Sequence, residues 1–267
     1  MAGTPPDIDT TVPHSARIWN YWLGGKDNYA IDQQVGDEIL QIFPQVGYLA
    51  RVVREFLGRV VTYLVREAGI RQIIDIGTGL PTVNNTHEVA QQIAPECRIV
   101  YVDNDPLVLA HARALLTSTA EGRTDYVNAD ARDTDTISSR AALTLDFDRP
   151  IAITMLGILG HIPDYAQARA IVKQLLDAVP TGSYLAITDP TNGEKMDALL
   201  RHWNEFGRPP MTARTPEQIA AFFNGLDLVD PGMVPVSQWR PHTTRIGSIS
   251  RGEEDPLGAL GRKPYIS

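Results

Sequence analysis

The fold is decided by the stretch Ile73-Ile74-Asp75-Ile76-Gly77-Thr78-Gly79-Leu80-Pro81. Isoleucines on both sides of an acid predict a short strand that is buried on both faces, as in a parallel sheet. The two glycines after it indicate a turn whose backbone approaches a ligand closely, because glycine carries no Cβ. Together, the strand and the turn predict a nucleotide-type pocket at the carboxyl end of the strand.

Two further acids follow predicted strands. The apolar run over residues 98–102 ends at Asp103, about where a carboxylate that holds ribose hydroxyls is expected. Asp130 follows a short predicted strand over residues 124–127. The carboxyl ends of parallel strands share one edge, so the glycine turn, Asp103 and Asp130 are expected at one crevice. Each also has a purely structural interpretation: a tight turn, a helix cap (for which Asp105 before Pro106 is the better candidate) and a solvated turn.

Strands and helices alternate along the rest of the chain. Predicted strands cover residues 72–76, 98–102, 124–127, 151–155 and 183–188, with helices near residues 87–93, 105–116, 136–143 and 165–179. Residues 226–236 and 257–262 are expected to form the last two strands, and a capping box at residues 215–218 opens a further helix. This alternation predicts an α/β fold with a seven-stranded, mostly parallel sheet.

The N-terminal part is predicted to be helical. Residues 1–13 are polar and contain proline, so a disordered leader is expected. Helices follow over residues 15–23, 31–43 and 47–68, and the last has a clear apolar stripe. Because the sheet leaves its carboxyl edge open, these helices are expected to form a lid. The predicted organisation is a leader (residues 1–13), a helical lid (residues 14–69) and a Rossmann-like domain (residues 70–267).

Composition narrows the classes of function. Lys and Arg number 24 against 32 Asp and Glu, a net charge of −8, and no basic cluster points to nucleic acid. The longest apolar run, residues 151–160, is too short for a bilayer, and no signal peptide pattern is visible, so a cytoplasmic protein is expected. The single cysteine, Cys97, is expected to be a packing residue. No His, Cys or Asp grouping has metal-ligand spacing, so no metal is predicted.

The glycine turn favours an adenosine ligand without a diphosphate. A dinucleotide fingerprint needs a third glycine three residues after the second, and this chain has Thr82 there, preceded by Pro81. S-adenosylmethionine is a ligand of the expected kind.

These motifs resemble the successive cofactor motifs of class I S-adenosylmethionine-dependent methyltransferases. More narrowly, the chain is similar to the bacterial S-adenosyl methyltransferase family, formerly a domain of unknown function. The similar stretches are residues 15–29, 69–72, 77–82, 87–90, 101–106 and 234–241. The resemblance covers nearly the whole chain from Pro13 and implies a Rossmann-like fold of the class I type that binds S-adenosylmethionine.

The resemblance also implies roles for residues at matching positions. The glycine turn would lie against the methionine part of the cofactor, Asp103 would accept from the ribose hydroxyls, and Asp130 from the adenine amino group. The cofactor-binding residues implied are Asp75, Gly77, Thr78, Gly79, Asp103, Asn104, Asp130, Ala131, Met155 and Leu156.

The residues that would bind the methyl acceptor are less clearly marked in the sequence. His161, after the fourth predicted strand, is a candidate general base, with local packing as the alternative. Tyr21 is a second catalytic candidate. Candidate lid or substrate contacts are Arg17, Lys26, Asp27, Asn28, Tyr29 and Arg54, with an ordinary polar turn as the alternative for the loop residues. Trp19 and Trp22 form either core or an aromatic wall, while His87 and His111 are expected to be structural.

One position departs from the family. The helix before the first strand usually carries Asn-Arg shortly before Phe, and this chain reads Val53-Arg54-Glu55-Phe56. Two enzymatic hypotheses therefore stay open: a methyltransferase for a small molecule in specialised metabolism, and the same fold repurposed for elimination or cyclisation, with a partner chain or a second copy as a further component. A non-catalytic binding subunit is opposed by the intact cofactor motifs.

Overall fold

A parallel sheet organises the residues that this computed structural model describes, which are 8–82, 84–115, 117–241 and 255–265. The strand order is β3-β2-β1-β4-β5-β8-β6, and β7 also pairs with β8. The parallel strands are β1 (Gln72–Ile76), β2 (Arg98–Asp103), β3 (Arg123–Asn128), β4 (Ala152–Leu156) and β5 (Tyr184–Asp189). The antiparallel strands are β6 (Asp227–Leu228), β7 (Val234–Pro235) and β8 (Leu257–Arg262).

The α/β fold class is confirmed, but the sheet has eight strands instead of seven. The strand expected over residues 226–236 is divided into β6 and β7, which pair with opposite ends of β8. Pro231 and Gly232 lie between them. Proline has no N–H for a strand ladder, and Gly232 has a φ of +84°, so a continuous strand cannot form there.

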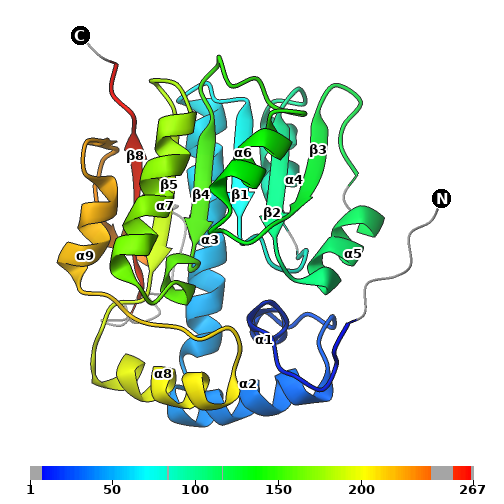
Figure 1. Cartoon of the computed structure of the whole chain (residues 1–267), viewed down its shortest axis with the longest axis vertical. Coiled ribbons are helices and arrows are strands. Elements are labelled where there is room, and N and C mark those ends of the chain that lie inside the picture. Colours follow the sequence, from blue (N-terminus) through cyan, green and yellow to red (C-terminus); the bar gives the residue numbers. More distant parts are fainter. Residues whose placement is uncertain (1–7, 83, 116, 242–254, 266–267) are drawn as a thin grey trace.

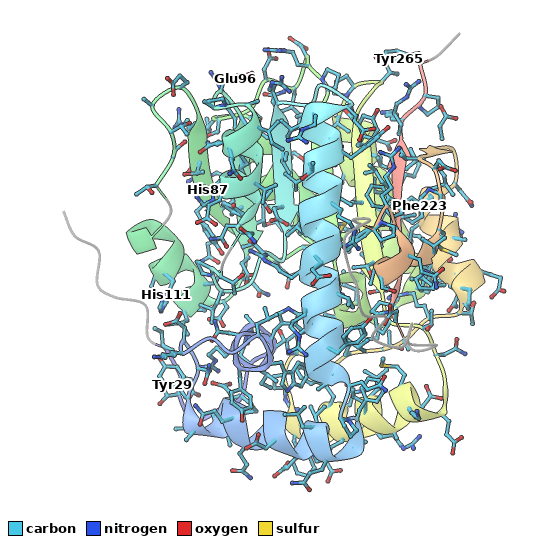
Figure 2. The ribbon with its side chains drawn as sticks, turned by 180° about the vertical axis from the view of Figure 1, so that it is seen from behind. Tyr29, His87, Glu96, His111, Phe223 and Tyr265 are labelled. Carbon is cyan, nitrogen blue, oxygen red and sulfur yellow. The ribbon has the colours of Figure 1, made fainter. Side chains whose placement is uncertain are left out.

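Helices cover both faces of the sheet. Helices α3 (Val46–Arg66) and α4 (Thr86–Ile93) lie behind it in Figure 1, and α6 (Thr134–Ala141) and α7 (Tyr165–Ala178) lie in front. Figure 2, seen from behind, shows α3 running along the sheet. Successive residues of a strand point to opposite faces of the sheet. Ile73 packs in the same core cluster as α3, and Ile74 packs in the cluster that includes residues of α6 and α7. Helix α5 (Pro106–Leu115) contacts β3, and α9 (Pro216–Ala220) lies between β5 and β6 along the chain.

A third layer crosses the carboxyl ends of the strands. It consists of α1 (Ser15–Trp22), α2 (Ala30–Ile42) and α8 (Glu194–Phe206) (Figure 1). Two of these helices, and α3, match expected helices, but α8 was missed. Its apolar residues Met196, Leu199 and Trp203 recur at helical spacing, which was a usable signal.

The expected leader falls into two parts. Residues 1–7 lie outside the described residues. Residues 8–13 run beside α1, where the guanidinium of Arg17 donates to the carbonyl oxygens of Asp9 and Val12. In the described part of the chain, no helix has the length and apolar character needed to cross a bilayer.

Candidate active site

A cavity of about 290 Å³ lies between the carboxyl ends of the strands and the lid layer, near the lower end of the usual size range of ligand pockets. Five neighbouring strands each bring their end to it. In sheet order these contributions are Asp130 after β3, Asp103 of β2, Gly77 after β1, Leu156 of β4 and Asp189 of β5. The structure thus brings together the glycine turn, Asp103 and Asp130, along with Asp75, Thr78, Asn104, Ala131, Arg54 and His161.

The glycine turn depends on both of its glycines. Gly77 has a φ of +71°, and a Cβ there would lie 1.9 Å from Cδ1 of Ile158. Gly79 has a φ of +65°, but a Cβ there would meet no atom within 4 Å. Gly77 therefore permits the turn to pack against the loop after β4, whereas Gly79 keeps the cavity side of the turn open.

Asp75 anchors this turn from beneath. Its carboxylate is fully buried and accepts from the hydroxyls of Thr86 (2.6 Å) and Thr154 (2.6 Å), which tie β1 to α4 and β4. Burial raises the pKa of Asp75, and the two hydroxyls and Arg54 oppose that rise. Asp75 thus serves as a support for the loop.

Arg54 reaches the cavity from α3. Its Nη2 donates to the carbonyl of Asn84 (3.2 Å) and to Oδ1 of Asn85 (3.0 Å), which begins α4. Its Nε is buried and has no hydrogen-bond partner. No carboxylate of the described residues forms an ion pair with it, so this guanidinium keeps unused donor capacity.

Asp103, at the carboxyl end of β2, is held in place by two backbone N–H groups. One carboxylate oxygen accepts from the backbone N–H of Gly79 (2.8 Å), and the other from that of Asp105 (3.0 Å). Burial raises the pKa of Asp103. Asp105 in turn accepts from the N–H of Leu107 (2.8 Å) and caps α5, as expected from Pro106.

The β3 end of the cavity is polar. Arg132 forms an ion pair with Asp130 (2.9 Å), and Asn104 donates to the same carboxylate (3.3 Å). The carboxyl group of Asp130 is 38% exposed, so it keeps free acceptor positions. Arg132, which sequence reasoning missed, also donates to the carbonyl of His161 (3.1 Å) and connects the two ends of the cavity.

His161 has a defined tautomer. It lies in the short helix η1 (Leu159–His161), and its Nδ1 is 3.0 Å from the carbonyl oxygen of Pro210. A carbonyl oxygen only accepts, so Nδ1 carries the proton and Nε2 is the unprotonated nitrogen. Burial lowers the pKa of His161, which keeps the ring neutral at pH 7. A neutral imidazole with an unprotonated Nε2 can accept a proton.

Asp189 and Arg214 form a buried ion pair that sequence reasoning missed. Their Oδ2 and Nη1 atoms are 2.7 Å apart. Asp189 also accepts from the N–H of Gly160 (2.9 Å), and Arg214 donates to the carbonyl of Ile162 (2.6 Å). The pair therefore holds the residues on both sides of His161. Its sequence signal was the acid at the end of β5, the same pattern as at Asp103.

Aromatic rings continue from His161 into the lid. The His161 and Trp203 ring centroids are 6.2 Å apart, those of Trp203 and Trp22 6.4 Å, and those of Trp22 and Trp19 6.0 Å. All four residues line the cavity. Trp22 is buried in the core and also lines the cavity.

Several candidate residues are not part of the cavity lining. Tyr21 donates to Asp37 (2.6 Å), and this bond raises its pKa, which opposes a role as a base. Arg17 lies 3.4 Å from Asp32 within the lid. The other residues outside the lining are Lys26, Asp27, Asn28, Tyr29 and Met155.

These residues instead build the lid and the core. Asn28 donates to the buried Asn20 (2.9 Å), and Asp27 lies 3.8 Å from His111 of α5. Figure 2 shows Tyr29 at the outer corner of the lid, below His111. Met155 is fully buried among residues of the α6 and α7 face, while its neighbour Leu156 reaches the cavity.

Two further side chains have structural surroundings. His87 is buried, and its Nδ1 lies 2.8 Å from the hydroxyl of Tyr101. Cys97 is a fully buried packing residue, as expected, and burial raises the pKa of its thiol to about 11. Within residues 8–82, 84–115, 117–241 and 255–265, no group of His, Cys, Asp and Glu side chains is arranged to hold a metal.

Comparisons with known proteins agree with this architecture. A DUF574 family protein from Streptomyces avermitilis is 42% identical, with a TM-score of 0.92 over 96% of this chain and 99% of that chain. A protein from Thermobifida fusca, provisionally named as a methyltransferase, is 37% identical, with a TM-score of 0.89 over 99% of this chain and 100% of that chain.

A more distant likeness shows the fold alone. An O-methyltransferase family protein from Burkholderia thailandensis is 16% identical, with a TM-score of 0.52 over 82% of this chain and 59% of that chain. A search of curated proteins finds no match. The model of the S-adenosyl methyltransferase family matches residues 1–264, and the chain therefore belongs to the S-adenosyl methyltransferase family.

Proposed function

We propose that this chain transfers a methyl group from S-adenosylmethionine to a small molecule held between the strand ends and the lid. The observation that carries the proposal is the row of Asp130, Asp103 and the glycine turn along one cavity edge. The bacterial, cytoplasmic and specialised-metabolism setting expected from the sequence is part of the same proposal.

The residues present fit this cofactor. Gly79 leaves open space where a side chain would intrude, and Asp103 and Asp130 present carboxylates for ribose hydroxyls and an adenine amino group. Arg54 offers a buried Nε without a partner, next to the glycine turn. A methionine carboxylate is the complementary group for this guanidinium. When bound, S-adenosylmethionine supplies a methyl group that is activated by a sulfonium sulfur.

The chain's own residues perform the remaining tasks. Helices α1, α3 and α8 line the side of the cavity opposite the strand ends. The strand ends and the lid hold two reactants in one orientation, which is the main requirement of a transfer with a good leaving group. His161 accepts a proton at Nε2 when the acceptor must lose one, and the Asp189–Arg214 pair holds its turn in place.

The alternative of elimination or cyclisation rests on the missing Asn before Arg54. In the structure Arg54 holds the turn at residues 84–85 and reaches the cavity, and no observation favours the alternative over methyl transfer. Product analysis separates the two reactions. Methyl transfer yields methylated acceptor and S-adenosylhomocysteine in equal amounts, whereas the alternative alters the substrate and leaves the cofactor intact.

Calorimetric titration with S-adenosylmethionine tests the proposal. The wild-type protein is expected to bind, and Asp103→Ala is expected to bind about tenfold to 100-fold more weakly, because a hydrogen bond to a charged group contributes about 1.5–3 kcal/mol. Asp148→Ala is the matched control, since this exposed carboxylate lies before β4, away from the cavity. Absence of binding by folded wild-type protein would overturn the proposal.

A further inference from the structure

We infer that the methyl acceptor is an uncharged aromatic compound with a hydroxyl group, which His161 deprotonates. This inference rests on the proposed function and adds the chemical class of the second substrate. It follows from the wall that faces the strand ends, the charges around it, and its distance from His161.

The acceptor wall is the lid side of the cavity. We define it by the apolar lining residues of α1, α3 and α8, which are Ala16, Trp19, Trp22, Val46, Leu49, Val53, Leu57, Met196, Leu199 and Trp203. Aromatic and aliphatic side chains of this kind bind a flat apolar ring by burial and edge-to-face contact.

Two tryptophans of the acceptor wall, Trp22 and Trp203, use their indole N–H groups within the protein. The indole N–H of Trp22 donates to the carbonyl of Gly36 (3.2 Å), and that of Trp203 donates to the carbonyl of Pro209 (2.8 Å). Both donors are thus used within the lid. The acceptor wall therefore offers ring faces and methyl groups, with no hydrogen bond from these two indoles to a ligand.

Most charged groups of the cavity lining are paired within the protein, while Arg54 forms no ion pair among the described residues. Asp189 is paired with Arg214, and Asp130 with Arg132. His14 lies 2.9 Å from Asp105, and Arg54 lies at the cofactor end beside the glycine turn. Among the described lining residues of α1, α3 and α8, Arg54 is the one charged side chain, and the proposed function assigns it to the methionine carboxylate, so a charge on the acceptor would have no counter-ion at the acceptor wall. This arrangement selects a neutral acceptor.

His161 adds the chemistry to this apolar wall. Its ring centroid is 6.2 Å from that of Trp203, and its unprotonated Nε2 is available as a base. Nε2 takes the hydroxyl proton, the acceptor oxygen forms a bond to the methyl carbon, and the carbon–sulfur bond breaks with its electron pair on sulfur. The products are the aryl methyl ether, S-adenosylhomocysteine and one proton, which the imidazolium releases to water. A phenolic hydroxyl suits an imidazole base better than an aliphatic one because it is more acidic.

A matched pair of probes tests the selectivity for neutral rings. 2-Naphthol and 6-hydroxy-2-naphthoate share the ring and the hydroxyl, and only the second carries a carboxylate at pH 7. Calorimetry is expected to show at least tenfold tighter binding of 2-naphthol, with and without S-adenosylhomocysteine. Equal or tighter binding of the carboxylate probe, or no binding of 2-naphthol, overturns the inference.

A charge placed in the acceptor wall is expected to reverse the preference. Met196 is half-buried on α8 and lines the cavity, so Met196→Lys is expected to fold and to place an ammonium group there. This variant should bind 6-hydroxy-2-naphthoate more tightly than 2-naphthol, while Met196→Leu keeps the wild-type order. An unchanged order in folded Met196→Lys contradicts the assignment of the acceptor wall.

The outcomes distinguish this inference from the proposed function. If S-adenosylhomocysteine binds and 2-naphthol does not, the acceptor class is wrong and the methyltransferase proposal stands. If 2-naphthol binds and no adenosyl compound does, the methyltransferase proposal is wrong. Conversion of 2-naphthol to its methyl ether, lost in His161→Gln with binding of both ligands retained, supports both.

Discussion

Gly79 and Arg54 are two residues of the site whose surroundings indicate a ligand. Gly79 leaves a volume without atoms, and Arg54 leaves a buried nitrogen without a partner. Buried polar groups in folded proteins usually have partners, so an orphaned one beside a cavity indicates a ligand group. Both features lie at the glycine turn, and each gives a prediction about the cofactor.

Gly79→Ala is expected to weaken binding of S-adenosylhomocysteine beyond its effect on stability. The matched control is Gly225→Ala, because Gly225 has a φ of +84°, has no atom within 4 Å of the position that a Cβ would take, and does not line the cavity. Both variants should lose about 1–2 kcal/mol of unfolding free energy from left-handed backbone strain. Calorimetry should show weaker binding for Gly79→Ala alone, and equal effects on binding would refute the open-space argument.

Arg54→Gln is expected to discriminate between two adenosyl ligands. If Arg54 binds the methionine carboxylate, the variant should bind S-adenosylhomocysteine at least tenfold more weakly, since hydrogen bonds between charged groups contribute about 1.5–3 kcal/mol. Binding of 5′-methylthioadenosine, which lacks the amino acid part, should stay within about twofold. A parallel loss for both ligands would mean that Arg54 acts only by holding the turn at residues 84–85.

The short helix η1 shows how an element is fixed by groups outside it. Asp189 holds the N–H of Gly160, Arg214 holds the carbonyl of Ile162, and Arg132 holds the carbonyl of His161. A buried ion pair contributes little net stability because desolvation offsets its attraction. Its position on both sides of His161 gives it a clearer role in orienting the imidazole.

The lowered pKa of His161 predicts a pH dependence. Burial stabilises the neutral ring, so the acid limb of kcat/KM should lie below pH 6.5. The unfolded chain takes up this proton near pH 6.5 and the folded chain only at lower pH. The unfolding free energy should therefore fall as pH drops below about 6.5, less so in His161→Gln. An acid limb above pH 7 would contradict the lowered pKa of His161.

Arg59 joins distant parts of the chain. From α3 it donates to the carbonyl of Trp239 (2.7 Å) and to that of Val236 (2.6 Å), and both contacts are buried. These bonds fasten the segment before residue 242 to the longest helix. The N–H of Val236 donates to the carbonyl of Pro256 (2.9 Å), next to β8, so the contact also connects α3 with that part of the sheet.

Arg59→Met is expected to lower the unfolding free energy by about 2–4 kcal/mol, because two buried carbonyls lose a charged donor. Arg51→Met is the control on the same helix, since Arg51 is exposed, and it should change the value by no more than about 0.5 kcal/mol. Denaturant titration of both variants measures the difference. Similar midpoints for the two variants would mean that the contact is dispensable.

The sheet was predictable from the sequence because buried parallel strands need unbroken apolar runs. An acid that directly follows such a run lies at the carboxyl edge of the sheet, where the strand ends meet. The lid was not predictable in this way. Polar side chains in the loop at residues 26–29 satisfy one another through Asn20, and only the packed structure shows that they turn away from the cavity. Met155 and Leu156 differ for a similar reason, since neighbouring strand residues face opposite sides and register decides which one reaches the ligand.

The cavity is assembled from two sets of segments that are separate along the chain. The strand ends at residues 75–79, 102–104 and 129–132 form one side, while α1, α3 and α8 form the other. Apart from Arg54, which the proposed function assigns to the cofactor, the side chains of these helices can therefore change without disturbing the adenosyl side. A library diversified only at Trp19, Val53, Met196 and Leu199 would sample new acceptor specificities while the cofactor-binding residues stay constant. Natural proteins of this fold can diverge in acceptor specificity by substitutions at the same positions.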